Sequence, residues 1–216
     1  ILFSHSHWDH IQGIPFFVPF YIKGNIFNIY SPFDDMLERL EYQQDESHFP
    51  VTLDYMQSTK NFFKLEAEEE FYLNEIRIFT KSMPHPGGAF GYRIESGNKT
   101  FVYTSDCEFN LESIDDIIEY ENLFHDADVV VFDTQYTFEE SIDDKLEYGH
   151  SSASIAIDIA AQFNVKHLIL FHHEPDYDDE KLLRVLANAK TYLSMNKDRI
   201  KDLQIDIAHE GMEITI

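Results

Sequence analysis

The chain has 216 residues with 40 acidic and 16 basic side chains, which gives a formal net charge of −24. A field of this sign repels polyanions, because binding to a phosphate backbone depends on Lys and Arg, so a nucleic acid is disfavoured as the main partner. The single cysteine excludes an internal disulfide and no apolar run reaches the length of a membrane span, so we expect a cytoplasmic protein with no membrane partner.

The N-terminal half of the chain alternates segments with strand-like and helix-like hydrophobic patterns. In chain order we expect a strand at 25–30, a helix over 34–44, two short strands within 71–82, and a hairpin of strands at 91–95 and 100–105. The segment 45–70 is polar and acidic, so we interpret it as a long connection. Such a connection fits a lid beside a site as well as it fits a tolerated surface insertion.

The C-terminal half continues this alternation. In chain order we expect a strand at 127–132, a helix after Ser151-Ser152, a strand within 168–173, a helix after Asp178-Asp179, and strands at 204–209 and 212–216. Either serine can cap its helix, because a hydroxyl oxygen can accept a bond from a backbone N–H group. No repeat or linker interrupts the pattern, so we predict one domain over 1–216.

Four strong metal-ligand side chains gather within six residues, directly after the apolar run 1–3. They are His5, His7, Asp9 and His10. Residues two apart point to the same side of an extended backbone, so His5 and His7 can hold one cation while Asp9 and His10 face a second. A chance polar loop is the alternative, but imidazoles and a carboxylate packed this closely would form a poor core. The string therefore predicts a dinuclear metal site.

The string His5-Ser6-His7-Trp8-Asp9-His10 resembles the HxHxDH signature of the metallo-β-lactamase-fold hydrolases. Three later residues, each beside an expected strand, match the family pattern in order: His85, Asp106 and His172. The resemblance implies that His5, His7 and His85 hold a first metal ion, that Asp9, His10 and His172 hold a second, and that Asp106 bridges both together with a hydroxide. Ligands at strand ends are physically reasonable, because a rigid sheet fixes them and the loops leave room for a substrate.

The resemblance also implies the fold, which is an α/β four-layer αββα sandwich with two sheets packed face to face and helices outside. Family members have several strands before the signature, whereas this chain begins at Ile1, inside the strand that leads to it. We therefore expect that the chain lacks its N-terminal strands and is part of a longer protein. The absent strands could supply part of a homodimer interface.

Two stretches resemble the branch of the superfamily that contains ribonuclease Z and related phosphodiesterases. Gly91–Glu95 matches a strand of that branch, and Gly149–Ala153 resembles its His-Ser-Thr motif. The segment 132–138 departs from the pattern, because it lacks the histidine and glutamate of the ribonuclease Z HEAT motif. This departure disfavours tRNA processing, and so does the lack of an evident basic arm. The segment fits better a set of small phosphodiesterase-like relatives.

The candidate ligands are imidazoles and carboxylates, which suit Zn²⁺ but also Mn²⁺ or Fe²⁺, and zinc is the first choice on the resemblance. We assign catalytic roles to Asp9 and His150. The resemblance implies that His150 steadies the developing phosphoryl charge and protonates the leaving oxygen. The alternative for His150 is a side chain at the helix entry that bonds the backbone. Asp133 could orient a ligand histidine, and Trp8 could either pack beneath the metal loop or line the pocket.

These features lead to one main functional prediction and two alternatives. We expect a dinuclear metal-dependent phosphodiesterase that acts on a small nucleotide-like or cyclic phosphodiester, because two divalent ions can activate water and clamp a phosphoryl group. The same chemistry would also serve a hydrolase of lactones, carboxylic esters or β-lactams. A non-catalytic metal-binding signalling module is the alternative from another class.

Overall fold

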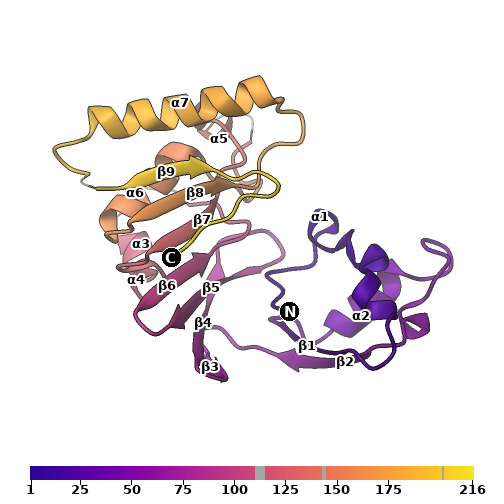
Figure 1. Ribbon diagram of the computed structural model, residues 1–216. Helices are drawn as coiled ribbons and strands as arrows, with labels where there is room; N and C mark the ends of the chain where they lie inside the picture. The colour runs from indigo at the N-terminus through magenta and orange to yellow at the C-terminus, as the bar shows by residue number, and fades with distance from the viewer. Residues whose placement is uncertain (110–114, 143–144, 201) are drawn as a thin grey trace. The chain divides into compact units, whose positions relative to one another are not determined.

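The computed structural model describes residues 1–109, 115–142, 145–200 and 202–216 (Figure 1). The chain divides into two compact units, Ile1–Ala67 and Glu68–Ile216. The prediction of a single domain over 1–216 stays a prediction. No helix in the described ranges is both long enough and apolar enough to cross a bilayer.

The N-terminal unit is built on a two-stranded parallel sheet. Strand β1 (Ile26–Ser31) pairs with β2 (Thr59–Lys64), and Leu2 forms an isolated bridge to Tyr30 beside them. Short helices complete this unit: α1 (Trp8–Ile11), η1 (Ile14–Phe16), η2 (Val18–Tyr21), α2 (Met36–Gln43) and η3 (Leu53–Tyr55). The strand and helix expected at 25–30 and 34–44 are confirmed. The segment 45–70, which we interpreted as a long connection, contains η3 and the unexpected strand β2.

The core of the N-terminal unit explains how its short elements hold together. Its buried side chains come from the start of the chain, from β1, from the helices α1, η2, α2 and η3, and from the residue after η3: Phe3, Ile11, Phe20, Ile29, Met36, Leu40, Leu53 and Met56. Phe3 and Ile11 lie on the two sides of the His5–His10 string, so burial anchors both ends of that string.

The C-terminal unit contains a seven-stranded mixed sheet in the described part of the chain, with the strands in sequence order. The strands are β3 (Glu70–Leu73), β4 (Ile76–Met83), β5 (Ala89–Ser96), β6 (Lys99–Tyr103), β7 (Val129–Asp133), β8 (His167–Phe171) and β9 (Gln204–Ile207). Strands β3 to β6 are antiparallel and joined by short turns, whereas β6 to β9 are parallel. Parallel neighbours need crossover connections, which here contain helices.

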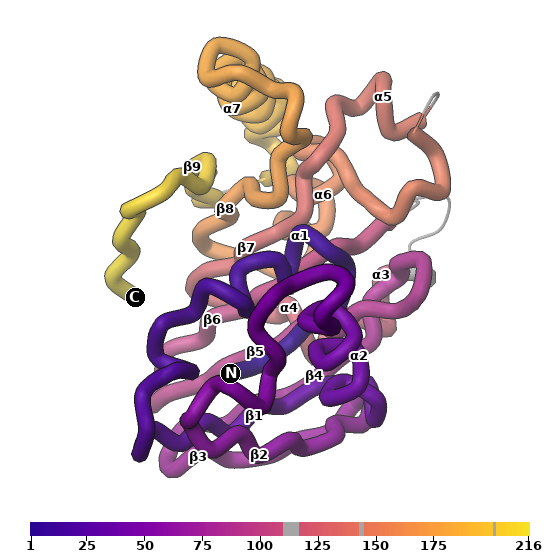
Figure 2. The backbone as a smooth tube through the Cα atoms, turned by 90° about the vertical axis from the view of Figure 1, so that its right-hand side faces the viewer, coloured from indigo at the N-terminus to yellow at the C-terminus, as the bar shows by residue number. Residues whose placement is uncertain are grey.

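Helices flank this sheet, as Figures 1 and 2 show for α6 and α7 beside β8 and β9. The helices are α3 (Asp115–Ile118), α4 (Glu121–Phe124), α5 (Phe138–Ile142), α6 (Ala153–Gln162) and α7 (Asp179–Met195). Val130, Phe132, Leu168 and Leu170 on the central strands are buried in one core with side chains of α6 and α7. The runs 129–132 and 168–171 are apolar at every position, which is typical of parallel strands that are covered on both faces. The predicted α/β class is confirmed.

Two expectations for the C-terminal unit need correction. Residues 212–216 form no strand, and β9 ends at Ile207. Ser152 occupies the N-cap position of α6, but its side chain makes no capping bond, while the Ser151 hydroxyl donates to the carbonyl of Cys107 at 2.7 Å. The side chain of Asp178 does cap α7, because it accepts a bond from the backbone N–H of Lys181.

Candidate metal centre

The parallel part of the large sheet brings acidic and imidazole side chains to one edge. Asp106 follows β6, Asp133 ends β7, and His172 directly follows β8. Because β6, β7 and β8 are parallel neighbours, their carboxyl ends lie at the same edge of the sheet. His172 adopts a left-handed backbone with φ of 57°, which residues other than glycine rarely adopt and which is common at functional sites.

Asp106 lies between two imidazoles. Its Oδ2 is 3.8 Å from Nε2 of His85 and its Oδ1 is 3.4 Å from Nε2 of His172, and the Asp106 side chain is only 2% exposed. Nδ1 of His85 lies 2.9 Å from the carbonyl of Gly149, so the ring presents Nε2 toward the carboxylate. One carboxylate with an imidazole at each oxygen has the chemistry of a bridging metal ligand, and the donor set fits divalent cations.

Asp133 forms a pair with His150 next to these residues. Oδ2 of Asp133 lies 2.8 Å from Nδ1 of His150 and accepts a bond from the backbone N–H of Cys107, while Oδ1 accepts one from Gln135. Burial raises the pKa of the Asp133 carboxyl, and the bond from His150 opposes this rise. The His150 ring stacks on His172 with centroids 4.9 Å apart. The alternative interpretation of His150 requires a bond to the backbone. The structure shows instead a bond to a buried carboxylate.

Two carboxylates and two imidazoles at this edge of the sheet form a cluster that could hold a metal ion. Donor atoms of Asp106, Asp133, His150 and His172 lie within 4.8 Å of one another. Sequence reasoning gave Asp133 only an orienting role, and it gave no role to the contact between Asp133 and His150. The cluster is consistent with a metal site in the C-terminal unit.

Glu108 joins two segments of the chain beside the cluster. Its two carboxylate oxygens accept bonds from the backbone N–H groups of Glu147 and Gly149, at 2.8 and 2.7 Å. These bonds fasten the loop after Asp106 to the segment that leads into His150. The positive φ of Gly149, 95°, is the local signal that this segment needs a glycine.

We expect that Gly149→Ala weakens both folding and metal binding. A Cβ atom there would overlap the His85 imidazole and Pro86, on a backbone that L residues rarely adopt. The strain costs about 1–3 kcal/mol, and displacement of His85 should lower zinc affinity about 10- to 100-fold. Gly97→Ala is the matched control, because Gly97 also has a positive φ but its Cβ would meet no atom within 4 Å. Guanidinium unfolding and zinc titration measure both effects, and equal zinc affinities in the two variants would contradict the prediction.

Glu140 braces the segment that follows Asp133. It accepts bonds from the backbone N–H and the hydroxyl of Thr137, from the Tyr177 hydroxyl, and from Nζ of Lys181 at 3.1 Å. Burial alone would raise the pKa of Glu140, but these bonds outweigh it and lower the pKa to about 2. Tyr177 and Lys181 lie beyond His172, so Glu140 links the segment after β7 to the segment after β8.

The lowered pKa of Glu140 predicts a contribution to acid stability. A carboxyl whose pKa is depressed by folding stabilises the protein above its unfolded pKa of about 4.5, and the stabilisation is lost as pH falls toward about 2. We expect Glu140→Gln to lower the free energy of unfolding at neutral pH by about 1 kcal/mol after solvent screening, and to reduce its fall in acid. Urea unfolding as a function of pH measures both. Glu139→Gln, an exposed neighbour on α5, should change neither.

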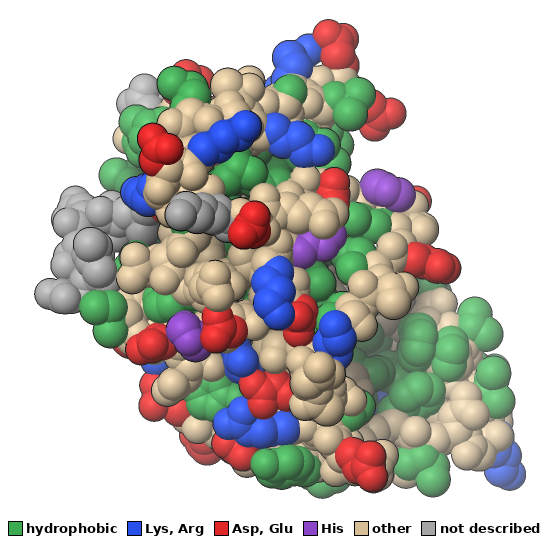
Figure 3. Space-filling model, turned by 60° about the vertical axis from the view of Figure 1, so that its left-hand side comes forward, with side chains coloured by type: hydrophobic (Ala, Val, Ile, Leu, Met, Phe, Trp, Pro, Cys, Tyr) green, Lys and Arg blue, Asp and Glu red, His purple; other side chains and the backbone are tan. Residues whose placement is uncertain are grey.

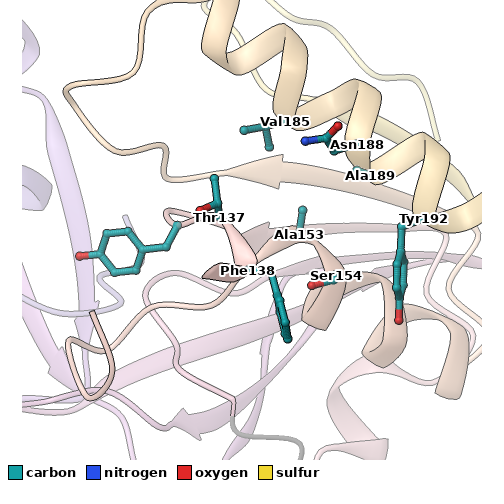
Figure 4. Close-up of a pocket in the computed structure, with 9 residues that line it drawn as sticks. Thr137, Phe138, Ala153, Ser154, Val185, Asn188, Ala189 and Tyr192 are labelled. Carbon is teal, nitrogen blue, oxygen red and sulfur yellow. The ribbon is translucent and has the colours of Figure 1, made fainter. Parts of the chain in front are cut away.

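An apolar cavity of about 210 Å³ lies between α6 and α7 (Figure 4). No residue of the cluster lines this cavity. Its lining has no charged side chain and comes from Tyr136, Thr137, Phe138, Ala153, Ser154, Val185, Asn188, Ala189 and Tyr192. Tyr136 lines the cavity and also contacts the cluster, because its ring packs edge-on against the His150 ring with centroids 5.5 Å apart. The chemistry of the cluster therefore does not take place in this cavity.

The N-terminal unit holds a second group of imidazoles. The ring of His5 lies 4.6 Å from that of His7 and 4.2 Å from that of His10, and Nε2 of His10 is 3.2 Å from Asp9. His7 is the N-cap residue of α1. Asp9 and His10 lie within this one-turn helix. Four donor side chains within six residues fit cation binding. The structure thus gathers the four N-terminal candidates in one unit, and His85, Asp106, His172 and His150 in the other.

Known proteins resemble this chain in sequence and in fold. A family model described as "Beta-lactamase superfamily domain" matches residues 1–173. The chain is similar to ribonuclease Z of Prochlorococcus marinus (strain NATL2A), with 30% identity over 150 residues, which cover 66% of this chain and 42% of that protein. The chain therefore matches less than half of the length of this relative.

Two solved structures share the fold. The metallo-beta-lactamase fold protein YhfI from Bacillus subtilis superposes with a TM-score of 0.69 at 20% identity, covering 98% of this chain and 74% of that one. Yeast PDE1 superposes with a TM-score of 0.69 at 16% identity, and the match covers 97% of this chain and 66% of the yeast chain. The family model spans most of the chain, and the imidazole and carboxylate groups at the sheet edge are consistent with a metal site. The chain therefore belongs to the metallo-β-lactamase superfamily of metal-dependent hydrolases.

Proposed function

We propose that this protein is a phosphodiesterase that acts on a small nucleotide-like or cyclic phosphodiester. The pair of Asp133 and His150 beside Asp106 and His172 is the observation that carries the proposal. A phosphodiester needs a proton for its leaving oxygen, and a histidine held by a buried carboxylate is suited to deliver one. The similarity to a ribonuclease, an enzyme class that cleaves phosphodiesters, supports the same chemistry.

The proposed cofactor is a pair of divalent cations, with zinc as the first choice. We propose that both units supply its ligands: His5, His7, Asp9, His10, His85, Asp106 and His172. When bound, such ions supply an activated water and electrostatic stabilisation of the phosphoryl group. Imidazole and carboxylate donors also suit Mn²⁺ and Fe²⁺, so metal content decides between these ions.

His150 acts on the leaving group in this proposal. The bond to Asp133 fixes Nδ1 as the protonated nitrogen, so Nε2 takes up and releases the transferred proton. Packing against Tyr136 and His172 holds the ring plane in place. Asp133 touches His150 and not the substrate, so it is a positioning residue.

The charge of the chain favours a small substrate over a polynucleotide. Two arginines on the large sheet are already paired with carboxylates: Arg77 bonds Glu70 and Glu95 at 2.6 Å, and Arg93 also bonds Glu95. Figure 3 shows acidic side chains interspersed with Lys and Arg on one face of the molecule. Paired cations contribute little to phosphate-backbone binding, because that binding depends on unneutralised positive charge.

Hydrolysis of bis(p-nitrophenyl) phosphate by zinc-loaded protein tests the proposal. We expect turnover that is lost on removal of the metal with a chelator and restored by zinc. A parallel panel contains cyclic nucleotides, lactones and a β-lactam. Turnover of the lactones or the β-lactam without turnover of any phosphodiester would overturn the proposal. Stoichiometric zinc binding without any hydrolysis would also overturn it.

A further inference from the structure

Trp8 is an exposed aromatic side chain inside the metal-binding string. We propose that Trp8 is the platform on which the base of a nucleotide substrate stacks, so that the enzyme prefers nucleotide diesters over simple diesters. This inference rests on the proposed phosphodiesterase function and names its substrate class. Stacking is sequence-tolerant, because every base presents a π-face, so the platform would accept different bases.

The structure shows that Trp8 does not pack beneath the metal loop. It is the first residue of α1 and its side chain is 61% exposed, whereas Ile11 on the same turn is 4% exposed. Ile11 and Phe3 belong to the core of the N-terminal unit, and Trp8 does not. Exposure of so large an apolar ring contributes nothing to folding, so the indole is available for a ligand.

The loop that carries Trp8 is braced by helix α2. Nη1 of Arg39 donates to the Ser6 hydroxyl at 2.8 Å, and the guanidinium lies over the Phe33 ring at 4.0 Å. Nε2 of Gln43 donates to the carbonyl of Ile11 at 2.7 Å. These contacts hold the backbone on both sides of Trp8, so a ligand would meet a pre-organised surface.

The position of Trp8 selects a group that is attached to the reacting phosphate. Its neighbours in the chain, His7 and Asp9, are candidate metal ligands, and consecutive Cα atoms are about 3.8 Å apart. A phosphate held by those ligands would place its nucleoside within reach of the indole. A chain with a net charge of −24 gains little from charge attraction to a nucleotide, whereas stacking requires no positive charge.

The single tryptophan makes the inference directly measurable, because all indole fluorescence comes from Trp8. AMP and ribose 5-phosphate, which differ by the base, are titrated into the zinc-loaded protein. We expect AMP to quench the emission and to bind more tightly by calorimetry. Trp8→Ala should weaken AMP binding about 5- to 100-fold and leave ribose 5-phosphate unchanged, as expected for loss of one stacked base.

Two further variants separate stacking from a structural role. Trp8→Tyr should restore most of the preference for AMP, because it restores an aromatic face. Tyr55→Ala, which removes an aromatic side chain that is 68% exposed in the same unit, should leave the preference intact. Equal affinity of the native protein for AMP and ribose 5-phosphate would overturn the inference, and so would an unchanged preference in Trp8→Ala.

Turnover distinguishes failure of this inference from failure of the proposed function. Hydrolysis of bis(p-nitrophenyl) phosphate together with equal affinities for the two probes would overturn the stacking role alone. Absence of turnover for every diester would overturn the phosphodiesterase function and, with it, the assignment of a nucleotide diester substrate.

Discussion

Replacement of Asp106 by alanine should lower kcat/KM for phosphodiesters by more than about a thousandfold, which corresponds to about 4 kcal/mol of transition-state stabilisation. The reason is its position, since each of its carboxylate oxygens faces one imidazole, from His85 and from His172. Loss of this carboxylate removes the group that we propose to hold both cations. Metal analysis of the purified variant should show loss of at least one zinc ion per chain.

The control for this variant is Asp198→Ala, which removes an exposed aspartate from the same unit. It should retain full zinc content and full activity. Circular dichroism of both variants tests whether the sheet and helices are intact. An Asp106→Ala protein that keeps two zinc ions and native turnover would contradict the assignment of Asp106 as the bridging ligand.

The second large effect concerns His150 and depends on the leaving group. We expect His150→Ala to lower kcat about 100- to 10,000-fold for a diester with an alkoxide leaving group, because general acid catalysis contributes that much. The loss should be far smaller for bis(p-nitrophenyl) phosphate, since p-nitrophenolate leaves without prior protonation. Steady-state kinetics with the two substrates measures the difference.

Asp133→Asn tests how His150 is held. Asparagine keeps the size of the side chain but not the charge that steadies Nδ1 of His150, so we expect a smaller loss of kcat with the same dependence on the leaving group.

Equal losses of kcat for both substrates in His150→Ala would contradict the role of His150 as proton donor. They would point instead to an electrostatic or structural role.

The sequence predicted strands best where the residues that decide them are close in the chain. The hairpin of β5 and β6 turns at Gly97. The apolar run of β7 predicts a strand that is covered on both faces. Strand β2 was missed because its pattern is largely polar and its partner β1 lies about thirty residues earlier. The segment 212–216 has strand-like residues but pairs with no strand among the residues that the structure describes, and local composition cannot reveal this.

The same distinction applies to the candidate site. The N-terminal ligand string is local, so its residue types and spacing alone are enough to propose it as a metal-binding string. The pairing of Asp133 with His150 and the bonds of Glu108 to the loop before His150 depend on contacts across 17 and about 40 residues. Such contacts follow from the parallel order of β6, β7 and β8, which no single motif specifies. Convergence of the two units on one pair of ions stays a prediction.

The ties around Glu140 have a consequence for motion at the sheet edge. Glu140 bonds Tyr177 and Lys181, and the side chain of Gln135 donates to Glu174 at 3.0 Å. The two loops that follow Asp133 and His172 are thereby joined at several points. Their amide protons should exchange with solvent together, as one cooperative opening unit, and acid that protonates Glu140 should loosen both loops before the rest of the sheet opens.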